Sequence, residues 1–418
     1  MTKSQRCGIL ESMDIRRKYL NIFEFLNSAP QMIFISGPRQ SGKTTFAKER
    51  LKEAASGCYL NWDIASDRRQ ILENISYDQM TERSEAGKSL VVLDEIHKYS
   101  DWKNYLKGQF DANKDHLKFL VTGSGRLDFF QKGKDSLAGR YFLFHIWPLT
   151  VAEFCKNSAT IEQFEAAPLT IRDEFSEELT SAWDQLSVCS GFPDPFFSGN
   201  EKMYRVWSDA YRSQLIHEDV RQLTRLEKID LLEKLVLILP YRVGGTLSID
   251  NLASDLQIAF DTVKKWLLVL ERFFICFRLS PWSAKISRSI TKEQKLYLFD
   301  YAVIKDPAAK FENMVAIELL RAVRNWRERG EGTWALNFVR DRDQREVDFL
   351  ITKDNQPFLL IEAKWSDEVP SQSLIHFQHR LGVPAVQLVG TKRVRRFFGS
   401  GKTSLLVSTA ADWLGQLP

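Results

Sequence analysis

Short, continuous apolar runs recur through the N-terminal third of the chain, and polar or amphipathic segments separate them. Met32–Ser36 is the first of these runs, Leu90–Leu93 is the second and Phe119–Thr122 is the third. Runs of this length are typical of strands buried on both faces, and the segment after the first run has the apolar spacing of an amphipathic helix. The pattern therefore predicts buried strands that alternate with helices.

The middle of the chain changes to a helical period. The segment from Thr160 to Leu215 combines apolar positions with mixed charge, which predicts a helical lid and connector. Further on, Ser248 is a suitable N-cap for a short helix, a turn follows near Gln257–Ala259, and Val263–Leu270 marks a longer helix. Two apolar strands with a polar, basic loop between them come next. Helix, turn, helix and hairpin is the order of a winged helix.

The C-terminal quarter reads as an amphipathic helix, three strands, a helix and another strand. The second and third strands lie in EVDFLITKDNQPFLLIEAKW, which spans Glu346 to Trp365. Glu362 and Lys364 share one face of their strand because they are two residues apart, and Asp348 lies on the preceding strand. We expect Asp348 and Glu362 to share one Mg²⁺, and Lys364 to steady or deprotonate an attacking water.

Composition and charge narrow the class of protein. The 418 residues exceed one ordinary core, so about two to four domains are expected. The 58 basic residues nearly balance the 54 acidic ones, so any contact with nucleic acid requires a local basic patch. The five cysteines are scattered without a CxxC pair, and neither a signal-peptide core nor a membrane-length apolar run is present. We therefore expect a cytoplasmic protein with no membrane partner.

The segment MIFISGPRQSGKTTFAKERL carries the strongest chemical signal. Its residues Gly37–Thr44 fit G-x-x-x-x-G-K-[ST] between a strand and a helix, as a phosphate-binding loop requires. Backbone N–H groups of such a loop close around phosphates at the helix N-terminus. Lys43 is expected to reach the β- and γ-phosphates of ATP, and Thr44 to ligate Mg²⁺. The residues predicted to bind the nucleotide are Gly37, Pro38, Arg39, Gln40, Ser41, Gly42, Lys43, Thr44 and Thr45.

Polar residues after the later apolar runs fit ATP hydrolysis. Asp94 and Glu95 end the second run, where Asp94 can hold the Mg²⁺ shell and Glu95 can orient the attacking water. Ser124 follows the third run and suits either a reporter of nucleotide state or a helix N-cap. Arg140 lies between a helix end and a strand, where it could meet a phosphate of its own or a neighbour's nucleotide, or be an ordinary surface arginine.

These motifs, in this order, make the chain resemble the prokaryotic AAA-type ATPases that carry a C-terminal domain of uncharacterised function. The matching segments are ISGPRQSGKTT, YLNWD, LVVLDEIHK, VTGSGR, SLAGRYFLFHIWPLTVAEF and GFPDP. The resemblance implies an α/β core with a five-stranded parallel sheet and helices on both faces. It also implies nucleotide roles for Lys43, Thr44, Asp94, Glu95, Ser124 and Arg140.

The order of the C-terminal elements resembles the core of the PD-(D/E)XK nucleases, and the resemblance implies this restriction-endonuclease-like α/β fold. Glu312 and Gln378, on the two flanking helices, could complete the ring around the metal. The bare [DE]-x-K triplet is a weak signal, since it also occurs at Asp101–Lys103 and Glu293–Lys295 without an upstream acidic strand. A salt-bridged hairpin kept as scaffold is the alternative.

DNA contact would come from the second helix and the wing of the winged helix. The candidate contacts are Lys264, Lys265, Lys285 and Arg288. Winged helices also serve as protein-docking modules, so both uses stay open. The run Lys392–Lys402 has five cations and no acid, which suits a phosphate backbone or a solvated charge run. The GKT at Gly401–Thr403 lacks the first loop glycine and predicts a turn, and His376 and His379 predict surface positions.

Together these features predict an ATPase core over residues 1–158, a lid and connector over 159–215, a winged helix over 216–305 and a nuclease-like module over 306–418. The leading hypothesis is an ATP-hydrolysing AAA-type protein that acts on DNA and carries a Mg²⁺-dependent nuclease-like module. The alternative is a nucleotide-switched regulator that binds DNA or protein through an inactive nuclease fold. Arg140 further predicts ATP-dependent assembly into a homo-oligomer.

Overall fold

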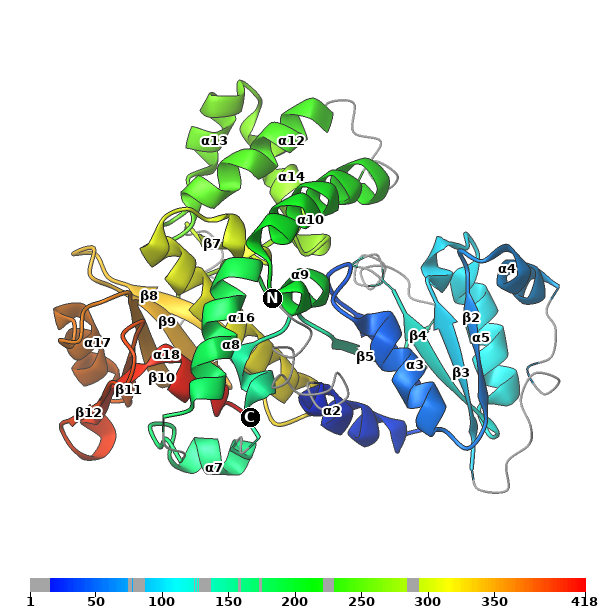
Figure 1. Ribbon diagram of the computed structural model, residues 1–418, viewed down its shortest axis with the longest axis horizontal. Coiled ribbons are helices and arrows are strands. Elements are labelled where there is room, and N and C mark those ends of the chain that lie inside the picture. Colours follow the sequence, from blue (N-terminus) through cyan, green and yellow to red (C-terminus); the bar gives the residue numbers. More distant parts are fainter. Residues whose placement is uncertain are drawn as a thin grey trace, which may run out of the picture. The chain divides into compact units, whose positions relative to one another are not determined.

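The computed structural model describes residues 16–73, 77, 87–123, 125, 127, 137–156, 159–172, 175–220, 229–283 and 293–418. The chain divides into two compact units, Met1–Trp147 and Pro148–Pro418, each of which has its own sheet (Figure 1). The predicted divisions of the chain after residues 215 and 305 fall inside the second unit and stay predictions. No helix among the described residues is long and apolar enough to cross a membrane.

The first unit is built from strands that alternate with helices. Its elements are α2 (Arg17–Asn27), β1 (Met32–Ser36), α3 (Lys43–Glu53), β2 (Gly57–Asn61), α4 (Ala65–Leu72), β3 (Ser89–Asp94), η3 (Ile96–Lys98), α5 (Trp102–Asn113), β4 (Leu117–Thr122) and β5 (Tyr141–His145). The five strands described in this unit form one parallel sheet in the order β2-β3-β4-β1-β5. The predicted five-stranded parallel sheet is thereby confirmed.

Helices cover both faces of this sheet, because successive side chains of a strand point to opposite faces. On one face Phe34 of β1 packs against Trp102 of α5, with ring centroids 6.2 Å apart. On the other face Phe144 of β5 packs against Phe46 of α3, also at 6.2 Å. The burial of all five residues of β1 explains why its sequence is a continuous apolar run that ends in a serine.

The second unit begins with helices and continues with a hairpin and a mixed sheet. Its first elements are η4 (Val151–Phe154), α7 (Ile161–Ala166), α8 (Glu177–Cys189), α9 (Pro193–Ser198), α10 (Glu201–Gln214), η5 (Leu215–Val220), α12 (Ile229–Ile238), η6 (Leu239–Arg242), α13 (Ile249–Leu256), α14 (Phe260–Arg272), β6 (Cys276–Leu279) and β7 (Lys295–Leu298). The remaining elements are η7 (Tyr301–Val303), α16 (Pro307–Glu328), β8 (Trp334–Arg340), β9 (Glu346–Lys353), β10 (Gln356–Lys364), α17 (Gln372–Leu381), β11 (Ala385–Val389), β12 (Arg395–Phe398), η8 (Gly401–Thr403), β13 (Leu405–Thr409) and α18 (Ala410–Gly415).

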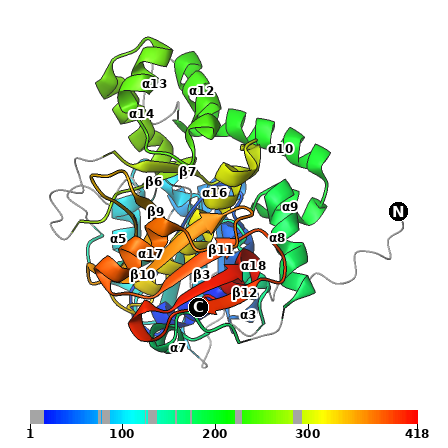
Figure 2. The ribbon, with the colours of Figure 1, turned by 90° about the vertical axis from the view of Figure 1, so that its left-hand side faces the viewer.

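The six described strands of the C-terminal part form one sheet in the order β12-β13-β11-β10-β9-β8. Strands β8, β9 and β10 are antiparallel neighbours, whereas β10, β11 and β13 run parallel. Figure 2 shows this sheet with α17 beside it, and both α16 and α17 contact β9 and β10. The sequence reading missed β12 and β13, because it interpreted their segment as a charge run and a turn. Only the turn at Gly401–Thr403 was predicted correctly.

The helix–turn–helix and hairpin expected in the middle of the chain are present. The Ser248 hydroxyl accepts a hydrogen bond from the Asn251 N–H at the start of α13, as predicted for an N-cap. Gln257 ends α13 in the left-handed conformation, and α14 begins at Phe260. Strands β6 and β7 pair antiparallel, and Thr246 adds a single bridge to Lys295. The predicted wing residues Lys285 and Arg288 lie outside the described residues.

The edge strand β8 is partly covered by the chain that follows β6. The Phe338 N–H donates to the Ser280 carbonyl at 3.3 Å, and the Trp282 N–H donates to the Phe338 carbonyl at 2.7 Å. Pro281 forms a parallel bridge with Phe338 between these two bonds. The edge therefore has backbone partners on its outer side at this point.

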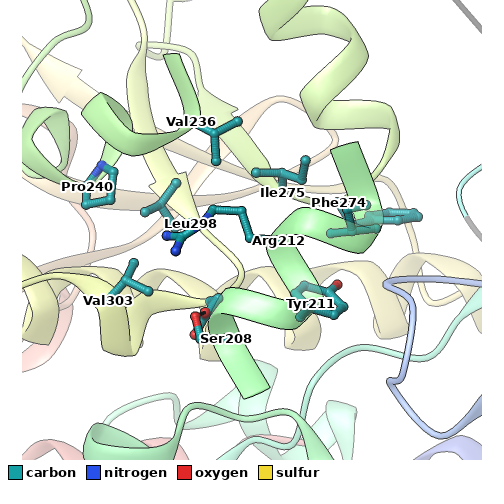
Figure 3. Close-up of a pocket in the computed structure, with 11 residues that line it drawn as sticks. Ser208, Tyr211, Arg212, Val236, Pro240, Phe274, Ile275, Leu298 and Val303 are labelled. Carbon is teal, nitrogen blue, oxygen red and sulfur yellow. Dashed lines mark hydrogen bonds between the residues drawn. The ribbon is translucent and has the colours of Figure 1, made fainter. Parts of the chain in front are cut away.

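A small, mainly apolar cavity lies among α10, η6 and the hairpin strands. Figure 3 shows Tyr211, Val236, Pro240, Phe274 and Leu298 among its lining residues. Its volume of about 50 Å³ is enough for a water or two and far too small for a nucleotide. The polar wall includes Asp300, whose carboxylate accepts hydrogen bonds from Tyr204 at 2.9 Å and Ser208 at 2.6 Å. We therefore interpret this cavity as a packing feature that joins α10 to the hairpin.

Candidate functional site

The phosphate-binding loop follows β1 and ends in the first turn of α3. Gly37 and Gly42 both have positive φ, 139° and 91°, which side chains rarely tolerate. A Cβ on Gly37 would stand 2.2 Å from the Ile146 carbonyl oxygen, so only glycine fits there. The Lys43 ammonium is turned onto the loop and donates to the carbonyls of Gly37 at 3.1 Å and Pro38 at 2.6 Å. The structure thus gathers the predicted loop residues, Gly37 to Thr45, at one helix N-terminus.

Asp94 ends β3 beside this loop and is surrounded by neutral donors. Its Oδ2 accepts from the Thr44 hydroxyl at 2.8 Å and from the Tyr59 hydroxyl at 2.7 Å. Asn61 Nδ2 lies 3.4 Å from the same oxygen, and the Thr122 hydroxyl donates to Oδ1. The carboxylate is 3% exposed, so these bonds hold it in one orientation toward the loop. Sequence reasoning identified Thr44 and Asp94 but missed Tyr59, Asn61 and Thr122.

Glu95 comes directly after Asp94 in a left-handed conformation, with φ of 57°. Lys98 Nζ lies 3.2 Å from Glu95 Oε2, and the same ammonium lies 2.6 Å from Asp63. Burial raises the pKa of the Glu95 carboxyl, and the charge of Asp94 raises it further, against the opposing effects of Lys98 and Lys43. A carboxylate with a raised pKa accepts a proton more readily, which suits a group that orients and activates water.

The oxygen set of this site fits a magnesium ion. The Thr44 hydroxyl and the Asp94 carboxylate are hard donors that face one another at 2.8 Å beside the loop, and Mg²⁺ in P-loop sites is held by these two residue types. Ser124, predicted to lie between the acids and the γ-phosphate, is outside the described residues. The predicted residues that the structure brings to this end of the sheet are Lys43, Thr44, Asp94 and Glu95.

Arg140 is not brought to this site. It directly precedes β5, and Tyr141 pairs with Met32 at the start of β1, whereas the loop follows the other end of β1. Because the strands are parallel, Arg140 lies at the edge of the sheet opposite the nucleotide loop. Its guanidinium forms two bonds with Asp111, at 2.9 and 3.0 Å. A role toward the nucleotide of its own chain therefore has no support in this geometry, and a role toward a neighbour's nucleotide stays a prediction.

Residues 29–155 match the sequence family described as an AAA domain. Together with the parallel sheet, the loop and the acids at the end of β3, this match makes the N-terminal unit a P-loop domain of the AAA type. Residues 180–307 and 308–403 match two families described as domains of unknown function, DUF8612 and DUF4143.

Curated relatives leave the purpose of the chain open. An uncharacterised protein of Mycobacterium tuberculosis and one of Mycobacterium bovis are each 25% identical over 298 residues, covering 71% of this chain and 60% of theirs. An uncharacterised protein of Methanocaldococcus jannaschii is 25% identical over 302 residues, covering 65% of this chain and 61% of its own. The chain thus spans about three fifths of the length of the relatives it matches.

Solved structures show only a remote likeness. A DNA replication initiation factor is 14% identical, with a TM-score of 0.26 over 64% of this chain and 90% of that one. PCH-2 of C. elegans is 14% identical, with a TM-score of 0.24 over 61% of this chain and 67% of that one.

The second cluster of acids lies in the second unit, at β9 and β10. Lys364 Nζ is 2.8 Å from Glu362 Oε1, and the Ala363 N–H donates to Asp348 Oδ2 at 3.0 Å. Burial raises the pKa of Glu362 to about 8, with the charge of Asp348 as the next cause. The structure therefore brings Asp348, Glu362 and Lys364 together. Glu362 Oε2 is buried and has no hydrogen-bond partner among the described residues.

A residue that sequence reasoning discarded lies within this cluster. Lys295 Nζ is 2.9 Å from Asp348, 3.1 Å from Glu312 and 2.7 Å from Glu346. Burial alone would lower the pKa of Lys295, but its interactions with Tyr297 and with the carboxylates of Asp348, Glu312 and Glu346 outweigh burial, and the pKa is raised. Lys295 had been set aside as part of a chance [DE]-x-K triplet. A lysine directly before the apolar run Leu296–Phe299 was the signal that could have found it.

Magnesium does not fit this second cluster as it stands. Asp348 is engaged through both oxygens, by Lys295 and by the Ala363 N–H. Among the described residues no three acidic, histidine or cysteine side chains are grouped so that they could hold a metal ion. Gln378 was predicted to complete the ring, but it is buried and its amide donates to the Ser404 carbonyl at 2.8 Å, which corrects that prediction.

The predicted cationic surfaces differ in how far ion pairs neutralise their charge. Lys264 and Lys265 are exposed on α14. In the run Lys392–Lys402, however, Lys392 binds Asp184 at 2.7 Å and Arg396 binds Glu368 at 2.8 Å, so part of its charge is neutralised within the unit. His379 is exposed as expected, and His376 lies 3.7 Å from Asp341.

An unpredicted groove of about 740 Å³ lies in the second unit between β8, α17 and the chain before the predicted wing. Its lining residues include Trp282, Arg340, Arg342, Arg345 and Arg380. Arg342 and Arg380 are exposed and form no ion pair within the described part of the chain, whereas Arg345 is bound to Asp341 at 2.8 Å. The groove therefore presents guanidinium groups to solvent.

Proposed function

We propose that the protein binds ATP with Mg²⁺ at the loop Gly37–Thr45 and hydrolyses it. The observation that carries the proposal is the Thr44–Asp94 contact of 2.8 Å at the joint between the loop and β3. It supports a metal position that both a hydroxyl and a carboxylate can reach, beside backbone N–H groups suited to phosphate. The match of residues 29–155 to an AAA domain supports the same reading.

Each residue has a distinct part in this proposal. Lys43 leaves the carbonyls of Gly37 and Pro38 to neutralise the β- and γ-phosphates. Thr44 and Asp94 would hold Mg²⁺, which when bound would neutralise phosphate charge. Glu95 orients the attacking water and accepts its proton, and Lys98 holds the Glu95 side chain in place.

The direct test is nucleotide binding by a Lys43→Ala variant. We expect it to lose ATP binding, because no other cation of the loop is placed on the β/γ-phosphates, and binding would be measured by titration with a fluorescent ATP analogue. Lys52→Ala is the matched control, since Lys52 lies exposed on the same helix and should leave binding unchanged. Unchanged binding in Lys43→Ala would refute the site.

We also propose that the second unit contacts DNA. The observation that favours it is the arginine-lined groove near the hairpin of the predicted winged helix, together with exposed Lys264 and Lys265 on α14. Guanidinium groups in a fork geometry suit phosphate oxygens, and a recognition helix suits the major groove. We also propose that the protein self-associates in the presence of ATP, and that Arg140 then reaches the nucleotide of a neighbouring chain.

Salt dependence separates DNA contact from protein docking. We expect duplex binding to weaken steeply as salt rises, because each neutralised phosphate releases counterions. Arg342→Ala with Arg380→Ala should weaken it by about tenfold or more, by analogy with the loss of two phosphate contacts. Arg205→Ala with Arg324→Ala, two exposed arginines outside the groove, is the control. A wild type that binds neither duplex nor single strand at low salt would leave the winged helix as a protein-docking module.

The C-terminal module supports a nuclease-like fold more strongly than nuclease activity. The observed order α16-β8-β9-β10-α17-β11 is the one predicted for a PD-(D/E)XK core, and Asp348, Glu362 and Lys364 lie together on it. We propose that the module adopts this fold. Cleavage would further require a divalent ion at Asp348, and both of its carboxylate oxygens are already bonded.

A further inference from the structure

Lys295 is a charged residue buried within a carboxylate cluster. Its side chain is 1% exposed, and its ammonium lies between 2.7 and 3.1 Å from one oxygen each of Glu346, Asp348 and Glu312. Three carboxylates this close would repel one another without a cation, and a buried ammonium without partners would be equally costly. The lysine and the acids therefore depend on each other.

The cation and the acids come from different elements. Lys295 is the first residue of β7 in the hairpin, whereas Glu312 belongs to α16, and Glu346 and Asp348 belong to β9. The hairpin is fixed beside the acids by neutral contacts as well. The Asn313 side chain bonds both the N–H and the carbonyl of Leu298 at 2.8 Å, and the Tyr297 hydroxyl donates to Glu312 at 2.8 Å. The docked hairpin thus delivers a positive charge to the cluster.

The carboxylate oxygens of Asp348 and Glu362 differ in whether they have a hydrogen-bond partner. Both carboxylate oxygens of Asp348 already accept a hydrogen bond, Oδ1 from Lys295 and Oδ2 from the Ala363 N–H. Glu362 Oε2, in a side chain that is 3% exposed, has no partner among the described residues. A divalent ion bound by Asp348 would lie close to the Lys295 ammonium, which is 2.9 Å from Oδ1, and the two like charges would repel one another.

We propose that Lys295 takes the place of a divalent ion in this cluster, as the protein's own cation. While β7 is docked, the acids bind the ammonium and have little affinity for Mg²⁺ or Mn²⁺. Removal of the ammonium would leave the oxygens of Glu312, Glu346 and Asp348 without their cation, and we expect a divalent ion then to bind in its place. The inference rests on the nuclease-like module proposed above and is independent of the ATP site.

The test is Mn²⁺ binding in the absence of nucleotide, measured by electron paramagnetic resonance. All proteins would carry Asp94→Asn, so that the P-loop acid does not contribute. We expect Lys295→Met to bind one Mn²⁺ at this cluster at least about tenfold more tightly than its parent does, because the variant lacks the ammonium that competes with the metal. Adding Asp348→Asn or Glu346→Gln to Lys295→Met should abolish this binding.

Lys118→Met is the matched control. Lys118 is also a buried lysine, but its ammonium meets the carbonyl oxygens of Leu26 at 3.3 Å and Ala29 at 2.6 Å rather than carboxylates. Its removal should weaken folding without creating a metal site. If the parent binds Mn²⁺ at Asp348 as tightly as Lys295→Met does, the proposal is wrong. That outcome would not count against the proposed ATP hydrolysis, because Asp348 and Asp94 belong to separate units.

A second measurement keeps the proposal testable if Lys295→Met does not fold. Asp348→Asn can be made in the chain that retains Lys295, and its thermal unfolding compared with and without Mn²⁺. If Lys295 is the cation, the variant unfolds at a lower temperature by the same amount in both conditions, to within about 1 °C. A drop that appears only with Mn²⁺ would instead show that the native cluster holds the metal.

Discussion

Asp94 and Asp348 both lie on sheet strands, and their surroundings differ in charge. Asp94 is held by hydroxyl and amide donors of Thr44, Tyr59, Asn61 and Thr122, which add no charge of their own. Asp348 is held by the ammonium of Lys295 and one backbone N–H. Neutral donors orient a carboxylate and leave its charge available to a cation from outside, whereas an internal ammonium cancels that charge.

This difference separates two sites that look alike in sequence. Both have an acid on a strand, a second acid nearby and a lysine in reach. The first acid site faces a loop of backbone N–H groups, and its lysine, Lys43, donates to the carbonyl oxygens of Gly37 and Pro38. The second has its lysines on the carboxylates themselves, at 2.8 Å for Lys364 and 2.9 Å for Lys295. Acid composition alone therefore does not define a metal site.

The sharpest test of the comparison is Glu95→Gln. We expect ATP hydrolysis to fall at least ~100-fold with ATP binding retained, because the amide cannot accept the proton of water. Phosphate release and nucleotide titration measure the two effects separately. Glu362→Gln, the matched change in the other cluster, should leave ATP hydrolysis measured without DNA unchanged. Equal losses in both variants would mean that the two clusters work as one site.

The second prediction concerns stability rather than catalysis. Asp348→Asn should lower the free energy of unfolding of the second unit by roughly 2 kcal/mol or more, because it leaves the buried Lys295 with a weaker set of partners. Asp94→Asn should cost less, since its neutral donors can still meet the amide oxygen. Urea unfolding followed by a probe in each unit would measure both. A larger cost at Asp94 would reverse the comparison.

A smaller loss of stability is expected when one neutral hydrogen-bond donor to Asp94 is removed. Tyr59→Phe removes the hydroxyl that lies 2.7 Å from Asp94 Oδ2, while Thr44, Asn61 and Thr122 remain. We expect a loss of about 1 kcal/mol in the stability of the first unit, the usual worth of one such hydrogen bond. Tyr241→Phe, at a site that is 70% exposed, is the control and should change little. No difference between the two variants would remove Tyr59 from the site.

The smallest effect is a change in pH dependence at a third buried acid. Burial raises the pKa of Glu318 to about 8, and one of its oxygens accepts from the Val151 N–H at 2.6 Å. The folded state therefore retains a proton that the unfolded chain releases at lower pH, so the stability from this group is lost as pH rises through about 8. Glu318→Gln should flatten the fall of thermal stability between about pH 5 and pH 8. Parallel curves for the two proteins would contradict the assignment.

Sequence patterns predicted the parts of the fold that follow local rules. The apolar runs gave β1, β3 and β4, because a parallel strand buried on both faces has no polar positions to obscure it. Ser248 was recognisable as an N-cap since its hydroxyl serves a neighbouring N–H. Strand β12 was not recognisable, because RRFF is charged and exposed, and only its pairing with β13 makes it a strand.

The candidate site residues could likewise be predicted where they belong to one local motif, and not where only the tertiary fold brings them together. The loop Gly37–Thr45 could be predicted because its chemistry is contained in one contiguous motif. The carboxylate partners of Lys295 could not be predicted, because they lie 17 or more positions further along the chain and only the tertiary fold brings them to the lysine. Arg140 shows the converse, since its motif was recognised but the direction of β5 places it at the other edge of the sheet.

The backbone pairing between Phe338 and the segment Ser280–Trp282 has a consequence for how the second unit opens. A bare edge strand frays and offers its amides to other chains. Here the amide protons of Phe338 and Trp282 each serve the opposite segment, so neither can exchange with solvent unless the segments part. The two amides should therefore exchange at similar rates, and slow exchange at both would identify the hairpin and β8 as a single cooperative unit.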